Sequence, residues 1–223
     1  MNGPCRGLSR ISCSWRDVIG VAVSLLHPIL KQSFAVIDQE IGAHAFAPEE
    51  YAIVRRVIHS TADFEFKDLL RFGPGAIPGA IAALRQGTPI ITDVSMVKQG
   101  IQTLVQQTFH NPIVSAVEQA TTADPGATRT ETGLLRCLAQ YPQGIYVIGN
   151  APTALLALCR QVPAIAQPAL VIGAPVGFIA VIESKQALAA TPVPQIRVEG
   201  RKGGSPVAAA ILNALLVLAW EQE

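Results

Sequence analysis

The sequence predicts a single three-layer α/β/α domain with a mainly parallel central sheet. Short apolar runs of strand length alternate with helical stretches along the chain, which is the pattern of a parallel sheet between helices. Half of the 223 residues are hydrophobic and only 15% are charged, as expected where strands and helices are covered on both sides. We see no internal repeat and no linker. Residues 1–24, with Gly and Ser, are expected to be an irregular N-terminal extension, and residues 25–223 the domain.

The first part of the domain is predicted to be helical. Residues 27–45 carry apolar side chains at the spacing of one helix face. Pro48 suits the first position of a second helix, because its missing N–H would be unpaired there anyway, and the helical pattern continues to about Ile58. A third helical stretch covers residues 79–86.

Three short apolar runs are predicted to be buried parallel strands. They cover residues 89–94, 145–149 and 169–173, and each ends at or next to a polar residue or a glycine. This is typical of strands whose carboxyl ends open on a crevice. Residues 179–182 fit a strand and the start of a helix equally well, since four residues are too few for periodicity to decide.

Helices are predicted between and after these strands. Residues 153–160 and 183–188 have helical patterns. Ser205 and Pro206 form a helix start, as a cap and a first-turn proline, for a long apolar helix that reaches Trp220.

The composition argues against several classes of protein. The formal net charge is +1, with no run of basic residues, so nucleic-acid binding is not expected. The surplus of apolar residues is typical of a cavity or a subunit interface, and we expect an oligomer rather than a monomer. The four cysteines form no CxxC pair and are expected to be small buried or free thiols in a reducing cytosol.

Two apolar segments resemble membrane or export signals only superficially. Residues 18–26 follow three arginines, but they are few for a signal peptide and no clear cleavage site follows. Residues 207–220 are shorter than the roughly 20 residues of a membrane span. We therefore expect a cytoplasmic protein without a membrane partner.

Three polar or glycine-rich turns should meet at the carboxyl ends of the strands: residues 149–153, 173–178 and 200–205. The last combines glycines, two adjacent cations and the start of a helix, a pattern that favours anion binding. A capped surface turn with solvated charges explains it equally well. The turn matches neither the P-loop nor the dinucleotide fingerprint, so nucleotide binding is not favoured.

A second candidate group lies near the end of the second predicted helix. Arg56 and His59 are three residues apart and share a helix face. The helix dipole there favours a protonated His59, whereas the charge of Arg56 acts in the opposite direction. The pair suits a proton donor beside an anion-holding arginine, although a histidine at a helix end is also commonly a cap or packing group.

Other titratable residues carry weaker signals. Asp63 and Asp93 could be acids, or each could cap a neighbouring turn. The remaining histidines, His27, His44 and His110, are scattered without metal-ligand spacing, so we expect no metal site.

Six segments together resemble one family in order and spacing. From His27 to about Leu216 the chain is similar to the precorrin-8X (cobalt-precorrin-8) methylmutases. The segments are HPILKQSFAVIDQEIG, VRRVIHSTADFEF, ITDVSMVKQGI, GNAPTALLAL, PVGFIAVIESKQAL and GRKGGSPVAAAILNALL.

The resemblance implies an α/β/α homodimer that binds a tetrapyrrole near its subunit interface and needs no cofactor. It implies an isomerase of cobalamin biosynthesis, which moves a methyl group from an α-carbon to the adjacent β-carbon of ring C. The product would be hydrogenobyrinate, or cobyrinate from a cobalt-containing substrate, and the sequence does not distinguish the two.

The resemblance also implies roles for individual residues. The family's catalytic histidine falls on His59, as a general acid or base, and its substrate-contacting serine and arginine fall on Ser33 and Arg56. The remaining positions in family motifs that are expected to face the ligand are Asn150, Thr153, Arg201, Lys202, Gly203 and Ser205.

The chain departs from the family pattern in three places, one of which is the N-terminal extension, for which the family offers no counterpart. Ala62 stands where glycine is common, and we expect a slightly different backbone there. Thr130 replaces a serine and keeps the hydroxyl. Two other classes remain open from the residues alone, a non-catalytic corrinoid-binding carrier and a nucleotide-dependent enzyme.

Overall fold

The structure is a computed structural model that describes residues 27–222 of the chain. The predicted extension and the apolar segment 18–26 lie outside the described residues. In chain order the elements are α1 (Pro28–Glu40), α2 (Pro48–Thr61), α3 (Phe66–Leu69), β1 (Leu70–Phe72), α4 (Ala76–Arg85), β2 (Ile90–Thr92), α5 (Ser95–Gln107), β3 (Ile113–Ser115), the 3₁₀ helix η1 (Ala116–Gln119), α6 (Arg129–Gln140), β4 (Ile145–Ile148), α7 (Pro152–Ile165), β5 (Leu170–Gly173), α8 (Val181–Ala190), β6 (Gln195–Val198) and α9 (Ser205–Glu221).

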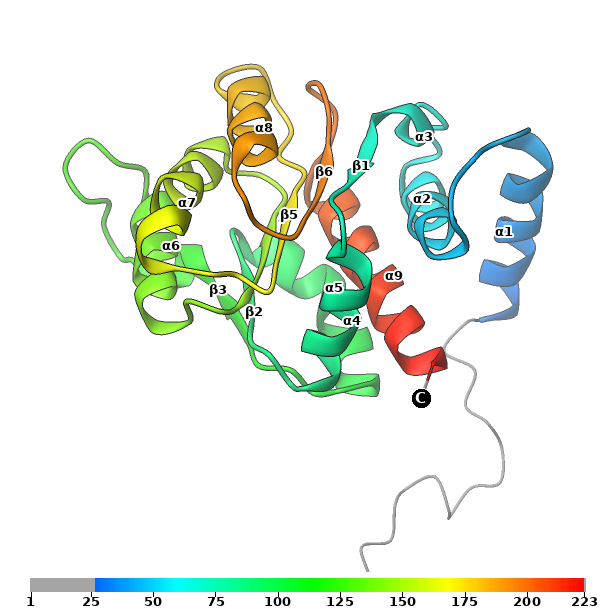
Figure 1. Cartoon of the computed structure of the whole chain (residues 1–223), viewed down its shortest axis with the longest axis horizontal. Helices are drawn as coiled ribbons and strands as arrows, with labels where there is room; N and C mark the ends of the chain where they lie inside the picture. The colour runs from blue at the N-terminus through cyan, green and yellow to red at the C-terminus, as the bar shows by residue number, and fades with distance from the viewer. Residues whose placement is uncertain (1–26, 223) are drawn as a thin grey trace, which may run out of the picture.

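The predicted fold class is confirmed. The strands form one sheet in the order β1-β6-β5-β4-β2-β3, in which only β1 runs antiparallel to its neighbour. Helices α6, α7 and α8 cover one face, and α4, α5 and α9 cover the other (Figure 1). Helix α2 packs on α9, and α1 packs on α2.

The central strands are apolar throughout because helices cover both faces. In β4, Ile145 and Val147 enter the core beneath α9, whereas Tyr146 and Ile148 enter the core beneath α6 and α7. The Tyr146 hydroxyl donates a hydrogen bond to the carbonyl oxygen of Tyr141 at 2.8 Å, so this buried polar group is paired. Such two-sided burial is the physical reason for continuous apolar runs in parallel strands.

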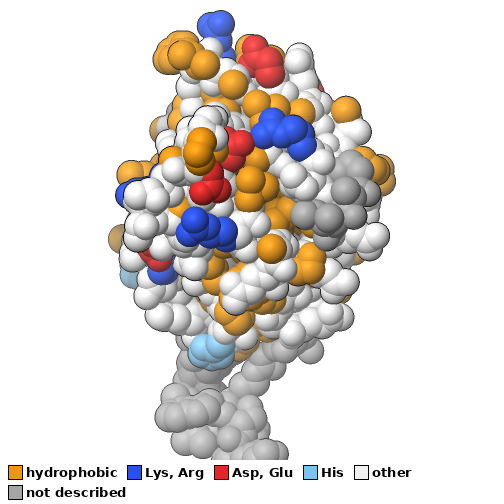
Figure 2. Space-filling view, turned by 90° about the vertical axis from the view of Figure 1, so that its left-hand side faces the viewer, with side chains coloured by type: hydrophobic (Ala, Val, Ile, Leu, Met, Phe, Trp, Pro, Cys, Tyr) orange, Lys and Arg blue, Asp and Glu red, His pale blue; other side chains and the backbone are white. Residues whose placement is uncertain are grey.

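The surface on the α6 and α7 side carries no patch of one charge. Figure 2 shows Lys, Arg, Asp and Glu side chains of both signs among apolar ones on this face. Among residues 27–222, no helix combines the length and the apolar character that a membrane crossing requires. Cys137 and Cys159 are buried free thiols, as predicted for cysteines of this chain.

Several predicted boundaries are corrected. Helix α1 ends at Glu40 rather than at residue 45, because Gly42 has φ of +72° and breaks the helical backbone. Helix α4 begins at Ala76, three residues before the predicted start. The ambiguous segment 179–182 is the start of a helix, since α8 begins at Val181.

The predicted cap of the last helix is wrong by one residue. Gly204, with φ 115° and ψ 167°, is the N-cap of α9, and Ser205 is its first helical residue. The Gly204 N–H donates to the carbonyl oxygen of Ala174 at 2.8 Å. This contact with the β5–α8 turn holds the glycine in a conformation that a serine would adopt only with strain.

Ala62 ends α2 in the left-handed conformation, with φ 54° and ψ 28°. Its N–H donates to the carbonyl oxygen of Ile58 at 2.7 Å. An alanine therefore takes up the backbone that glycine adopts without steric cost.

We expect Ala62→Gly to raise the free energy of unfolding by about 1 kcal/mol, because it removes the strain of a Cβ at positive φ. Urea denaturation followed by circular dichroism measures the change. Ala82→Gly is the matched control: Ala82 is an exposed residue inside α4, and this substitution should lower stability by roughly 0.5–1 kcal/mol. A loss of stability in Ala62→Gly would contradict the expectation.

Candidate active site

The structure brings the three predicted turns together at the carboxyl edge of the sheet. The Gly204 N–H bonds the β5–α8 turn, and the Gly177 N–H donates to the carbonyl oxygen of Arg201 at 3.3 Å. A Cβ built on Gly149 would lie 2.9 Å from the Cα of Ser205, so the β4–α7 turn lies directly against the start of α9. Glycine is needed at this contact because the two backbones approach too closely for a side chain.

Gly203 allows the second close approach. Its φ is +153°, and a Cβ there would lie 2.3 Å from the carbonyl oxygen of Ala174. A larger residue would separate the turn before α9 from the turn after β5. Gly203, expected from the resemblance to face the ligand, therefore has a packing role as well.

Asp93 caps the β4–α7 turn. It follows β2, is fully buried, and accepts the N–H groups of Asn150 (2.6 Å) and Ala151 (2.8 Å) on Oδ2. Its Oδ1 accepts the N–H of Val94 at 2.9 Å. Burial raises the pKa of Asp93, and the backbone N–H groups around the carboxyl oppose that rise.

Of the two readings left open for Asp93, the structure supports the cap. The carboxylate of Asp93 also occupies two backbone donors of the β4–α7 turn, the N–H groups of Asn150 and Ala151. Asn150 is exposed. The Thr153 hydroxyl lies 3.0 Å from that of Thr128, the N-cap of α6.

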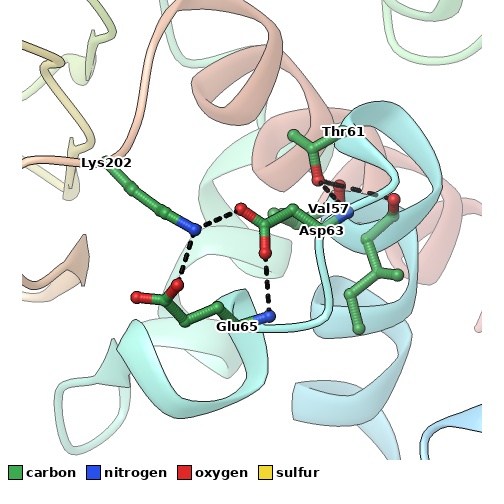
Figure 3. A network of polar contacts seen from close by, with 6 residues as sticks. Val57, Thr61, Asp63, Glu65 and Lys202 are labelled. Atoms are coloured by element: carbon green, nitrogen blue, oxygen red, sulfur yellow. Dashed lines mark hydrogen bonds and ion pairs between the residues drawn. The ribbon is translucent and has the colours of Figure 1, made fainter.

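Lys202 joins the turn before α9 to the segment after α2 (Figure 3). Its Nζ donates to Asp63 Oδ2 and to Glu65 Oε2, both at 2.6 Å. The hydrogen bond from Lys202 is the main reason why the pKa of Asp63 lies below its usual value. The ammonium of Lys202 is thus already engaged by two carboxylates, whereas Arg201 is exposed and lies 5.7 Å from the centre of the Phe178 ring.

His59 lies exposed in the last turn of α2. Its ring meets that of Phe34 edge to face, with 5.7 Å between centroids. Partial burial, and secondarily the positive charge of Arg56, lower the pKa of His59. Ser33 precedes Phe34 on α1, and its hydroxyl donates to the carbonyl oxygen of Ile29 at 3.0 Å.

The two adjacent arginines of α2 have different environments. Arg55 forms an ion pair with Asp38 at 3.0 Å and lies 4.5 Å from the centre of the Phe34 ring. For Arg56, by contrast, the described part of the chain supplies no ion-pair partner. Arg56 lines a cavity of about 80 Å³ between α2 and α9, and its guanidinium remains available for an anion.

The predicted site residues therefore fall into two groups. Ser33, Arg56 and His59 lie on α1 and α2, and the others lie on the turns at the strand ends. Within residues 27–222 no hydrogen bond or ion pair joins the first three to the turns. The contact between Lys202 and Asp63, four residues beyond His59, is what brings the end of α2 to the turn before α9.

Two larger cavities lie at the opposite edge of the sheet. One, of about 680 Å³, includes Phe72 and Gly73 at the end of the antiparallel strand β1. The other, of about 560 Å³, includes Pro89 and Gly144, which precede β2 and β4. Neither contains a predicted site residue. We place the site at the carboxyl edge, where parallel α/β sheets bind ligands and where the titratable candidates gather.

Lys185 was missed by sequence reasoning. It belongs to the buried face of α8, is 3% exposed, and donates to the carbonyl oxygens of Gly200 (2.8 Å) and Lys202 (2.7 Å). The position of this lysine on the mainly apolar face of the helix is the feature of the sequence that could have indicated it. Among the described residues, no group of three His, Cys, Asp or Glu side chains is arranged to hold a metal ion.

Comparison with known proteins identifies the chain first as a methylmutase, an isomerase, of cobalamin biosynthesis. The sequence model described as precorrin-8X methylmutase matches residues 28–218. The chain belongs to the precorrin-8X methylmutase family.

Individual relatives are similar to this chain over nearly their full length. A cobalt-precorrin-8 methylmutase from Synechocystis sp. is 60% identical over 215 residues, covering 90% of this chain and 99% of the relative. A precorrin-8X methylmutase from Pseudomonas aeruginosa is 38% identical over 194 residues, covering 84% and 93%. The crystal structure of the precorrin-8X methylmutase from Thermus thermophilus matches with a TM-score of 0.80 and 41% identity, covering 88% of this chain and 99% of that one.

Proposed function

We propose that this methylmutase converts precorrin-8X or cobalt-precorrin-8 into hydrogenobyrinate or cobyrinate, with His59 as general acid or base and without a cofactor. The observation that supports the catalytic role is the position of His59, accessible at the end of α2 with a pKa lowered by partial burial of its ring and by the charge of Arg56. Family membership and the names of the relatives support the substrate class.

The proposed methyl migration requires from the protein only a proton donor or acceptor and a binding site that holds the tetrapyrrole in one geometry. One carbon–carbon bond to the migrating methyl group breaks at the α-carbon and another forms at the adjacent β-carbon, so no other reactant is needed. A hydrogen bond or proton from His59 to a ring nitrogen polarises the conjugated system and lowers the barrier to migration. With its lowered pKa, His59 is mainly neutral at neutral pH, so one ring nitrogen can donate and the other can accept.

The carboxylate side chains of the tetrapyrrole are proposed to bind the dispersed donors of the site. Arg56 and Arg201 have no carboxylate partner among the described residues, and both can make charge-assisted hydrogen bonds. The remaining proposed contacts come from Ser33, Asn150, Thr153, Lys202, Gly203 and Ser205. Lys202 also fixes the distance between the turn and α2 through its carboxylate partners.

We further propose that residues 25–223 act as one domain of a cytoplasmic homodimer. The cavity beside Arg56 measures about 80 Å³, far below the roughly 300–1,000 Å³ of small-molecule pockets, so a second subunit would complete the site. Exposed apolar side chains of the β5–α8 turn support an interface at the carboxyl edge of the sheet: Phe178 is 86% and Ile179 is 87% exposed.

The proposed reaction is tested by incubating the protein separately with metal-free precorrin-8X and with cobalt-precorrin-8. The absorption spectrum should change to that of the product with at least one of them, and the relative rates identify the natural substrate. A spectrum that shows binding but no conversion of either compound would contradict the proposed reaction and indicate a carrier.

Arg56→Met is expected to raise the pKa of His59 toward 6.5, because it removes a positive charge that disfavours the imidazolium. The titration of the ring protons by NMR measures this pKa. Arg55→Met is the matched control, since the charge of Arg55 is paired with Asp38, and it should leave the pKa of His59 unchanged. An identical His59 pKa in Arg56→Met and the wild type would show that the two side chains are not coupled.

A further inference from the structure

A buried lysine lies beneath the turn before α9 without a carboxylate partner in the described chain. The inward face of α8 consists of Val181, Ser184, Lys185 and Leu188. An apolar side chain at position 185 would be enough for packing, and burying an ammonium is costly unless its protons are used. The two carbonyl oxygens that Lys185 contacts both belong to the turn, on either side of Arg201.

All three carbonyls at the tip of the turn accept hydrogen bonds from within the protein. Lys185 binds those of Gly200 and Lys202, and the N–H of Gly177 binds that of Arg201. A trans peptide unit directs its C=O and the following N–H in opposite directions, and residues 27–222 contain no cis peptide. The N–H groups of Arg201 and Gly203 therefore point away from Lys185, and that of Lys202 points away from Gly177.

These three N–H groups have no acceptor in the part of the chain that the structure describes. Successive N–H groups on one side of a turn form a concave site for an anion. Gly200, with φ +71°, and Gly203, with φ +153°, provide backbone conformations that other residues rarely adopt. The side chain of Lys202 contributes little free charge, because Asp63 and Glu65 already bind it.

We propose that Lys185 is a positioning residue: it turns the carbonyls of residues 200 and 202 inward, so that the N–H groups of residues 201 and 203 can bind a carboxylate of the substrate. This inference rests on the proposed function for the identity of the ligand, but the effect of Lys185 on the turn does not. Burial lowers the pKa of Lys185 to about 8, so the side chain remains mainly an ammonium at neutral pH.

The test uses Lys185→Met, which keeps the length of the apolar stem and removes the donor, in the full-length protein. Hydrogen exchange of the Gly204 N–H, which is bonded to Ala174, should become at least about tenfold faster by NMR, because the turn that holds Gly204 in place loses its inner hydrogen bonds. The KM for the substrate that the wild type converts should rise about tenfold, with kcat within about twofold, as for a contact that binds ground state and transition state alike.

Two further variants complete the design. Gln186→Met, at the next and exposed position of α8, should change neither exchange nor KM. Lys185→Arg retains the charge and donors and should restore most of the protection and of the substrate affinity. If Lys185→Met does not fold, Lys185→Gln, which is shorter and neutral but keeps two N–H donors, takes its place with the same expected direction.

Each outcome decides the proposal. Unchanged exchange at Gly204 would show that Lys185 does not hold the turn. Faster exchange with an unchanged KM would show that the turn does not bind the substrate. If the wild type converts neither substrate, the proposed function fails, and the exchange measurement still decides whether Lys185 orders the turn.

Discussion

His59→Ala is expected to lower kcat by roughly 10²–10⁴-fold, the usual contribution of general acid–base catalysis, while the protein still folds and binds the tetrapyrrole. The side chain is exposed, and its single ring contact, with Phe34, adds little to stability. Single-turnover absorbance measures the chemical step, and a spectral titration measures binding. Full turnover in this variant would exclude the acid–base role.

His44→Ala provides the control for this experiment. His44 lies at the other end of α2, where its ring stacks on Tyr51 with 4.2 Å between centroids. Its removal should leave kcat unchanged, because Tyr51, on which it stacks, precedes His59 by roughly two turns of the helix. His59→Gln adds a second comparison: a side chain that can donate a hydrogen bond but cannot transfer a proton. Partial activity there would indicate that hydrogen bonding to the ring, rather than proton transfer, is the main contribution.

Asp93→Asn is expected to lower the free energy of unfolding by about 3 kcal/mol, since hydrogen bonds to a buried charge are worth roughly 1.5–3 kcal/mol each and an unpaired donor is costly. The carboxylate accepts three backbone N–H groups with two oxygens. An amide offers one oxygen, and its NH₂ group faces N–H donors. The neutral amide avoids the cost of burying a charge, which offsets part of the lost stability. It still leaves a backbone N–H group without an acceptor.

Equilibrium denaturation measures the effect of Asp93→Asn. Asp124→Asn is the matched control: this exposed carboxylate forms only a long ion pair with Arg136, at 3.9 Å, and its loss should stay within about 0.5 kcal/mol. A loss below about 1 kcal/mol in Asp93→Asn would mean that the β4–α7 turn keeps its shape without the carboxylate.

The elements that the sequence predicted share a local signal. The apolar runs of β2, β4 and β5 are buried on both faces, and Pro48 and the glycine-rich turns mark helix and strand ends chemically. Strands β1, β3 and β6 were missed: β1 and β6 contain charged residues, and pairing with neighbouring strands defines all three. Helices α5 and α6 were also missed, although each has a buried stripe of the kind that predicts a helix.

The sequence by itself determined the alternation of strands and helices, the three turns, and the spacing that places Arg56 and His59 on one helix face. Only the tertiary structure determined which groups the charged side chains around them bind. Lys202 binds carboxylates more than 130 positions earlier in the chain, Lys185 lies beneath a turn 15 positions later, and Asp93 caps a turn 57 positions away. The sequence does not distinguish a charged residue that is solvated from one that is buried. The partners of such a residue depend on how the layers pack and not on its neighbours along the chain.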